Sequence, residues 1–419
     1  MAAIGSPVVY SPEAASETAP RFPAVSERFE VVCGPLVAGG DCLVRRDGEK
    51  TMFVNGAIPG ERVAVEIVEE RKDLVRAECV EVIESSPLRV EPSALLPLEA
   101  GGAEWQHISP DAQLQFKVDI ARDSLQRIAK IAQPEVVAGK SVSPDGYRTT
   151  MRFGVVDGNV AMRKKQSNDL VAIDACTIAH PRLRELFDCD FKDATEVTLR
   201  VSNSSIARAA WIRGEVDDLQ LPADVQVTNN GRNATISESV CGRDWQISAQ
   251  SFFQSGPQAA ALLCEAVNAR IHPDAGWVID LYSGIGLLGG TVAAERSCQL
   301  TCVEQSKSSI RDARHNLSDL AAEIIEAEVA TVSPAGSAKP DVVIADPPRT
   351  GLGKSAAKAV AGIDAPQVVL VSCDPASLAR DVVLLAGLGY EFVGTEVLDL
   401  FPQTSQLEAV STFSKAASK

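Results

Sequence analysis

The sequence lacks the patterns that hold metals, form disulfide frameworks or cross membranes. Its ten cysteines include no Cys-x-x-Cys pair, and its four histidines are dispersed, so neither a disulfide framework nor a zinc site is predicted. No apolar run approaches the ~20 residues of a membrane helix, and the first residues do not resemble a secretion signal. We therefore expect a cytoplasmic monomer that does not enter a membrane.

Positive charge is also scarce. The 419 residues carry 40 Lys and Arg against 56 Asp and Glu, a formal net charge of −16, which counts against a simple nucleic-acid binder. The segment 116–165 is an exception, with ten basic and five acidic residues, and it ends in Arg163, Lys164 and Lys165. This segment indicates either a solvated charged face or a local basic surface on an acidic protein.

Hydrophobic periodicity divides the chain into parts. Short strands with turn residues between them follow residue 28, a helix is expected at 111–132, and strands return between 147 and 240. From residue 276 onward, apolar strands alternate with helical segments, which predicts an α/β domain with a doubly wound parallel sheet. The expected order is a disordered lead-in at 1–27, an OB-type β-barrel at 28–87, a central α+β domain at 88–256 that binds RNA, and the α/β domain at 257–419.

A glycine turn follows the first strand of the α/β domain. Gly284 and Gly286 form a Gly-x-Gly turn, a weak signal alone, but Glu304 ends the next strand about twenty residues later. A carboxylate at that place accepts hydrogen bonds from ribose hydroxyls, and the third glycine of a dinucleotide fingerprint is absent. The pattern therefore predicts a nucleoside cofactor without a pyrophosphate, and S-adenosylmethionine is the common one.

Two later blocks place chemistry at strand ends. Asp346 opens Asp-Pro-Pro-Arg-Thr-Gly after the strand at 342–345, and Cys373 follows the strand at 368–371. Parallel strands present their carboxyl ends at one edge, so both side chains are expected in one cleft. Cys373 precedes a helix whose dipole is expected to lower the thiol pKa, which favours a nucleophile; the alternative is a small buried hydrophobic residue.

Five blocks in this order resemble the TRAM-domain RNA (uracil-5-)-methyltransferases, which modify tRNA or 23S rRNA. The resemblance extends over nearly the whole chain after residue 28. The blocks are Ser251-Phe252-Phe253-Gln254, Asp280-Leu281-Tyr282-Ser283-Gly284-Ile285-Gly286, Asp346-Pro347-Pro348-Arg349-Thr350-Gly351, Ser372-Cys373-Asp374-Pro375-Ala376-Ser377-Leu378-Ala379-Arg380-Asp381, and Leu398-Asp399-Leu400-Phe401-Pro402-Gln403-Thr404 with Leu407-Glu408.

The resemblance implies S-adenosylmethionine-dependent methylation of uracil C5 in rRNA or tRNA through a covalent bond between a cysteine and uracil C6. It makes Cys373 the nucleophile and Glu408 the general base. It also implies a binding set around the cofactor. That set is Gln254, Tyr282, Glu304 and Asp346, beside the glycine turn formed by Gly284 and Gly286.

Two departures from the family pattern have consequences. Many members hold an iron-sulfur cluster through a Cys-Gly-Gly-Cys run and two more cysteines, but this chain has Ala100-Gly101-Gly102-Ala103, and Cys176 alone remains of the set. We therefore expect no cluster, because one thiolate cannot replace about four. Asp374 stands where Asn is usual, and its negative charge is expected to oppose formation of the Cys373 thiolate.

Two other functions remain open from the sequence. One is a non-catalytic RNA-binding or RNA-folding factor that keeps the methyltransferase architecture, which the acidic charge and Asp374 favour. The other is a methyltransferase that acts on cytosine or on a small molecule. The basic segment and the barrel favour RNA over a small molecule.

Overall fold

A computed structural model of the chain describes residues 28–45, 48, 50–92, 96, 100–164, 167–214, 216, 218–229, 234–332 and 339–416. The expected lead-in at 1–27 lies outside these residues. The chain divides into two compact units, one that comprises residues up to Pro87 except Val37–Gly40, and one that comprises Val37–Gly40 and Leu88–Lys419. The finer domain boundaries drawn from the sequence remain predictions.

The N-terminal unit is a five-stranded sheet with the order β1-β4-β5-β3-β2. Neighbouring strands are antiparallel except for the parallel pair β3 and β5. Alternate side chains such as Val63, Val65 and Ile67 are buried, as expected for a sheet that is covered on one face. The prediction of a small β unit of the OB type is confirmed. Its strands are β1 (Phe29–Val32), β2 (Cys42–Val44), β3 (Thr51–Asn55), β4 (Arg62–Glu70) and β5 (Leu74–Glu84).

The larger unit begins with a second β-rich region. A six-stranded sheet has the order β12-β11-β10-β7-β8-β9, and the hairpin of β13 and β14 follows it. The hairpin meets helix α5, where the Asp312 carboxylate accepts hydrogen bonds from the backbone N–H and hydroxyl of Ser248 at 2.8 and 2.7 Å. The elements are β7 (Thr150–Val156), β8 (Asn159–Arg163), β9 (Leu170–Ala172), α2 (Pro181–Arg184), β10 (Glu196–Val201), β11 (Arg208–Arg213), β12 (Val225–Thr228), β13 (Thr235–Val240) and β14 (Arg243–Ser248).

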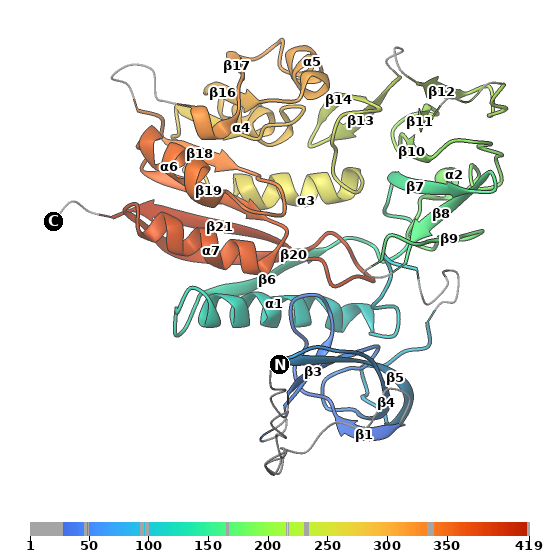
Figure 1. Ribbon diagram of the computed structural model, residues 1–419. Coiled ribbons are helices and arrows are strands. Elements are labelled where there is room, and N and C mark those ends of the chain that lie inside the picture. The colour runs from blue at the N-terminus through green and yellow to red at the C-terminus, as the bar shows by residue number, and fades with distance from the viewer. Residues whose placement is uncertain are drawn as a thin grey trace, which may run out of the picture. The chain divides into compact units, whose positions relative to one another are not determined.

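The rest of the larger unit is the predicted doubly wound α/β domain (Figure 1). Its eight-stranded sheet has the order β17-β16-β15-β18-β19-β21-β20-β6. The strands are β15 (Trp277–Leu281), β16 (Gln299–Glu304), β17 (Ala322–Glu326), β18 (Val342–Ala345), β19 (Gln367–Ser372), β20 (Tyr390–Asp399) and β21 (Glu408–Lys415), with β6 (Val136–Ser141) at the edge. The helices are α3 (Pro257–Asn268), α4 (Leu287–Arg296), α5 (Lys307–Asn316), α6 (Gly353–Ile363) and α7 (Pro375–Ala386), with a short 3₁₀ turn, η1 (Val329–Thr331).

The strand order reverses between β15 and β18. From β15 the chain proceeds outward through β16 and β17, and from β18 it proceeds the opposite way to β19. Right-handed crossovers then place α4 and α6 on opposite faces of the sheet. Ligands of such sheets bind outside the carboxyl ends of the strands at this reversal. The fold therefore brings the segments after β15, β16, β18 and β19 to one cleft.

One helix that packs on this domain and one strand at the edge of its sheet were not expected from the sequence. Helix α1 (Pro110–Arg127) packs on α7, and β6 pairs in parallel with β20 at the edge of the sheet. The sequence placed the helix in a separate central domain and did not predict the strand. Periodicity reports which face of a segment is buried, but not a pairing partner more than 250 residues away. Among the described residues, no helix is long and apolar enough to cross a membrane.

Candidate active site at the carboxyl ends of the strands

The glycine turn after β15 has the backbone that its sequence requires. Gly284 and Gly286 have φ of 55° and 88°, and Tyr282 has φ of 60°, which is rare for a residue with a side chain. A Cβ on Gly286 would lie 2.7 Å from a methyl group of Leu317. Conformation therefore favours glycine at both positions, and packing does so at Gly286 as well, while Tyr282 has the strained backbone that often marks a site.

Glu304 closes this turn from the next strand. Its Oε2 accepts the Gly284 N–H at 2.9 Å, and its Oε1 accepts the N–H groups of Gln305 and Ser306 at 2.8 and 2.7 Å. These bonds fix the carboxylate and leave further lone pairs for a ligand. The carboxylate borders a pocket of about 350 Å³, whose walls are Tyr282, Val303–Gln305, residues 327–330, Pro348 and residues 350–356.

The loop after β18 forms the other wall of the pocket. The Asp346 N–H donates to the Leu281 carbonyl at 3.3 Å, which ties the loop to the end of β15. Asp381 of α7 accepts the N–H groups of Leu352 and Gly353 at 2.8 and 3.3 Å. The Ser377 hydroxyl donates to the Arg349 carbonyl at 2.5 Å. The first turns of α7, which follow Cys373, therefore hold the loop that begins at Asp346.

Strand register brings Cys373 and Glu408 together. Strands β19 and β21 are antiparallel, and Ser372 pairs with Ala409. Cys373 follows Ser372 and Glu408 precedes Ala409, so one further step along this register makes the two residues neighbours, and the Glu408 charge is among the causes that raise the pKa of Cys373. Cys373 is partly exposed, whereas Glu408 is only 4% exposed. A thiol and a buried carboxylate thus lie side by side at the edge where Asp346 also emerges.

The pKa values of the acidic groups in this cluster are strongly shifted. Burial, together with the nearby Asp346 carboxylate, raises the pKa of Glu408 well above its usual value, and burial raises the pKa of Asp346 to about 7. Burial and the adjacent Glu408 raise the pKa of Cys373 to about 11, and the Arg349 guanidinium opposes this shift. The expected lowering of the thiol pKa by the helix dipole is therefore wrong for the free protein, because burial beside acidic groups outweighs the dipole.

Asp374 has a structural role that the sequence did not predict. It is the N-cap of α7, and its Oδ1 accepts the Ser377 N–H at 2.6 Å. A carboxylate at this place satisfies free helix N–H groups and complements the helix dipole. Burial, Glu408 and Asp346 raise the pKa of Cys373; Asp374 is not among these causes.

Not every expected site residue reaches the pocket. Of the expected cofactor set, Tyr282 and Glu304 line it, whereas Gln254, Gly284, Gly286 and Asp346 lie outside its described lining. Gln254 is buried in the loop before α3, and its neighbour Ser255 donates a hydroxyl hydrogen bond to the Leu400 carbonyl at 3.1 Å. Its role toward a cofactor stays a prediction. Arg349 and Asp381 stand in the same motif blocks as Asp346 and Cys373, and this position is the only sequence signal for the contacts that they make.

The segment that departs from the iron-sulfur pattern packs as ordinary core. Ala100, Ala103 and Cys176 are all buried in one hydrophobic cluster, and burial raises the pKa of the Cys176 thiol. Alanine side chains, which are buried without a ligand, thus stand where the family pattern has cluster-binding cysteines. Among the described residues, no three His, Cys, Asp or Glu side chains are grouped as metal ligands. The absence of a cluster remains a prediction.

The basic segment is less available than its charge count suggests. Lys117 is fully buried, and four further members pair with carboxylates. These four are Arg122 with Asp119, Arg127 with Asp123, Lys140 with Glu265 and Arg152 with Glu196. Arg163 is exposed, and Lys165 lies outside the described residues. The local basic surface is therefore confined to a smaller part of 116–165.

Similarity to known proteins agrees with this arrangement. The family model of the Methyltransferase small domain matches residues 255–362. A Streptomyces avermitilis protein named as an uncharacterized RNA methyltransferase is 31% identical over 432 residues, which cover 94% of this chain and 99% of that protein. The chain belongs to the RNA methyltransferase family. A second RNA methyltransferase of this kind, from Streptomyces coelicolor, is 30% identical and covers 94% of each chain.

The fold of this RNA methyltransferase is also similar to that of a solved structure. A Pyrococcus abyssi tRNA (uracil-54, C5)-methyltransferase, crystallised with S-adenosyl-L-homocysteine, is 25% identical with a TM-score of 0.72. The similarity covers 92% of this chain and 100% of the other. The family resemblance and the fold class predicted from the sequence are confirmed.

Proposed function

We propose that this RNA methyltransferase uses S-adenosylmethionine to methylate C5 of uracil in tRNA or rRNA, with Cys373 as the nucleophile and Glu408 as the general base. The observation that carries the proposal is the β19–β21 register: Ser372 pairs with Ala409, and Cys373 and the buried Glu408 are the next residues along it. Uracil C5 is a poor nucleophile until a thiolate adds to C6, and a base must then remove the C5 proton. The mechanism therefore needs a thiol close to C6 and a carboxylate close to C5 of the same base.

The pocket suits the proposed cofactor. The Glu304 carboxylate stands at the end of β16, where ribose hydroxyls bind in this class of fold, and Tyr282 lies beside it. The adjacent cluster of Asp346, Glu408 and Cys373 contains more acidic groups than cations, and the pKa values of all three are raised. Such a cluster attracts a positively charged ligand. When bound, S-adenosylmethionine would supply a methyl group on a cationic sulfur.

The residues of the chain then account for the bonds to the base. Cys373 loses its proton to water, and its sulfur adds to C6, which moves the electrons of the C5–C6 double bond into an enolate. C5 would take the methyl group from the sulfonium, whose sulfur keeps the electrons of the broken methyl–sulfur bond and leaves as the neutral thioether S-adenosylhomocysteine. Glu408 removes the C5 proton, the C5–H electrons restore the double bond, and the C6–S electrons return to Cys373 as the thiolate. The target uracil must first leave its stack, at a cost of a few kcal/mol, which favours loops.

The proposal is tested on RNA and then on variants. Mass spectrometry of nucleosides from total tRNA and rRNA, with and without the gene, should show 5-methyluridine lost at a defined site. Cys373→Ala should abolish both product and covalent RNA adduct, whereas Glu408→Gln should form the adduct and accumulate it. Cys241→Ser, which removes another partly accessible thiol, is the control and should retain activity.

Two outcomes would reject this function. An active Cys373→Ala variant would remove the covalent mechanism. No lost 5-methyluridine, with the protein expressed, would favour a non-catalytic RNA-binding factor or a different methyl acceptor. Assays on uracil-containing and cytosine-containing RNA would then separate these alternatives.

A further inference from the structure

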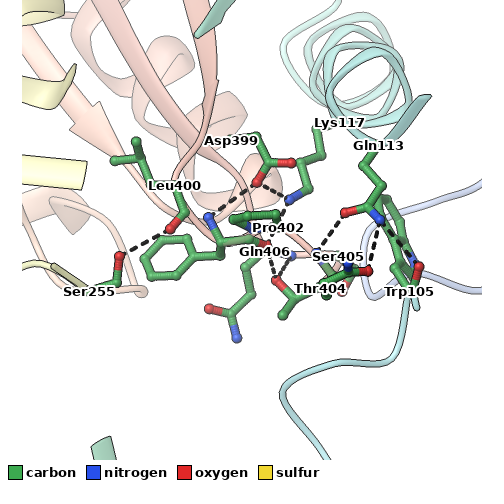
Figure 2. Close-up of polar contacts among 12 residues, drawn as sticks. Trp105, Gln113, Lys117, Ser255, Asp399, Leu400, Pro402, Thr404, Ser405 and Gln406 are labelled. Carbon is green, nitrogen blue, oxygen red and sulfur yellow. Dashed lines mark hydrogen bonds and ion pairs between the residues drawn. The ribbon is translucent and has the colours of Figure 1, made fainter. Parts of the chain in front are cut away.

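A buried ion pair lies beneath the loop that leads to Glu408. Lys117 of α1 and Asp399 at the end of β20 are 0% and 1% exposed, and the Lys117 Nζ lies 2.6 Å from the Asp399 Oδ1. The same ammonium donates to the Phe401 carbonyl at 3.0 Å, and the same carboxylate oxygen accepts the Phe401 N–H at 3.2 Å. Figure 2 shows the pair between the helix and the loop.

The rest of the loop is held by directed hydrogen bonds to its backbone. Gln113, one turn before Lys117 on α1, accepts the Gln403 N–H at 2.6 Å, and the Trp105 N–H donates to the Gln403 carbonyl at 2.8 Å (Figure 2). The Tyr147 hydroxyl donates to the Pro402 carbonyl at 3.1 Å. Gln403 needs this support, since its φ of 68° is unfavourable for a residue with a side chain.

The loop ends at the proposed base. Glu408 pairs with Leu398 across β20 and β21, and the segment from Leu400 to Leu407 is the whole connection between the two strands. The Lys117–Asp399 pair fixes the strand residue just before this connection, and Glu408 follows its last residue. A displacement of the connection would therefore move the Glu408 carboxylate relative to Cys373 on the neighbouring strand.

A buried pair is a poor way to gain stability alone, because removing two charges from water offsets most of their attraction. Burial lowers the pKa of Lys117 and raises that of Asp399, which indicates this cost. Unlike apolar side chains, the pair makes directional hydrogen bonds, because one ammonium binds both the carboxylate at the end of β20 and a loop carbonyl.

We propose that Lys117 is a positioning residue for Glu408, which acts through Asp399 and the loop 400–407 to set the base for removal of the C5 proton. This inference rests on the proposed function. It concerns only the last chemical step, because Cys373 is attached to β19 and does not depend on the loop for its place.

The test separates adduct formation from adduct release. The variant is Lys117→Met. The substrate is tRNA and rRNA from a strain that lacks the gene, labelled with [5-³H]uridine. The rate of covalent adduct formation is read from denaturing gels, and release of the C5 proton is read from tritium in water. We expect adduct formation to change less than about threefold and tritium release to slow roughly tenfold or more, since a misplacement of ~1 Å can cost about a hundredfold.

Two further variants make the result decisive. Lys117→Arg keeps the charge and should recover part of the release rate. Tyr390→Phe removes a buried hydroxyl bond to the Ala365 carbonyl at the opposite end of β20, so it should leave the ratio of the two rates unchanged. If folded Lys117→Met leaves the ratio of tritium release to adduct formation unchanged, whether both rates fall equally or neither falls, the inference is overturned.

Folding failure and failure of the proposed function remain distinguishable. If Lys117→Met does not fold, Tyr147→Phe removes one loop bond without burying a charge, and it should shift the ratio in the same direction by roughly two- to threefold. No shift there would also overturn the inference. Glu408→Gln is the reference: if it does not accumulate adduct, the proposed base is wrong, whatever Lys117 does.

Discussion

The Cys373 thiol is held in its protonated form by its neighbours. Burial and the Glu408 carboxylate raise its pKa to about 11, while Arg349 acts in the opposite direction. The ionised fraction therefore increases as the pH passes through that value, and well below it the free protein has little thiolate at residue 373. Removing the negative charge of Glu408 should lower the thiol pKa. Asp374 should have less influence, because its carboxylate is directed to the helix N-terminus.

Alkylation of Cys373 in the free protein measures this difference. Because burial also raises the pKa of Glu408, the difference should grow with pH as Glu408 ionises. Across a series of rising pH, Glu408→Gln should react with iodoacetamide up to roughly three- to tenfold faster than the unmodified protein, since one pKa unit is about a tenfold change in thiolate. Asp374→Asn keeps an oxygen that can cap the helix and should change the rate little. Peptide mass spectrometry distinguishes residue 373 from the other cysteines. A larger acceleration by Asp374→Asn would restore the idea that its charge opposes thiolate formation.

The loop 346–353 and helix α7 behave as one element of the site. Gly351 has φ of 77°, and a Cβ there would lie 2.4 Å from an oxygen of Asp381, the residue that also holds the N–H groups of Leu352 and Gly353. The loop can thus lie close against α7 only with glycine at this position. Because residues 350–356 line the pocket, its shape depends on this contact.

Two alanine substitutions near each other should have opposite effects. Gly351→Ala should destabilise the fold by about 1–2 kcal/mol through an unfavourable φ and the contact with Asp381, and should weaken binding of S-adenosylhomocysteine. Gly362→Ala, on α6 with nothing within 4 Å of a new Cβ, should stabilise the helix by about 0.5–1 kcal/mol. Thermal unfolding and calorimetric titration measure both. Unchanged binding in Gly351→Ala would separate the loop from the pocket.

At the scale of the whole molecule, an acidic protein must bind a polyanion. The net charge of −16 makes long-range attraction to RNA unfavourable, and five of the ten basic residues in 116–165 are paired internally. RNA contact should therefore depend on a few exposed cations and on shape. Arg163, at the end of β8, is one such cation.

Charge reversal tests that dependence. Arg163→Glu with Lys164→Glu should weaken RNA binding and reduce the slope of log affinity against log salt by about 1–2. Lys339→Glu with Lys358→Glu makes the same change of net charge before β18 and on α6, and should affect the slope less. Filter binding across a salt series measures the slopes. Equal effects at both places would mean that overall charge, rather than a local surface, governs affinity.

Local sequence determined much of the fold and the parts of the site. The alternation of strands and helices after residue 276 predicted the doubly wound sheet, since each segment's periodicity depends on the face that it buries. The Gly284–Gly286 turn and Glu304 were identifiable because their backbone and hydrogen-bonding needs are local. The placement of Asp346 and Cys373 at neighbouring strand ends followed from the same reasoning.

Tertiary structure alone decided the features that depend on distant partners. Pairing of β6 with β20 and burial of Lys117 against Asp399 join segments more than 250 residues apart, and no local pattern encodes them. The tertiary structure also decided the direction of the Cys373 pKa shift. A helix dipole can be inferred from sequence, but burial and the distance to Glu408 exist only once the strands are assembled, and in a low-dielectric environment these terms dominate.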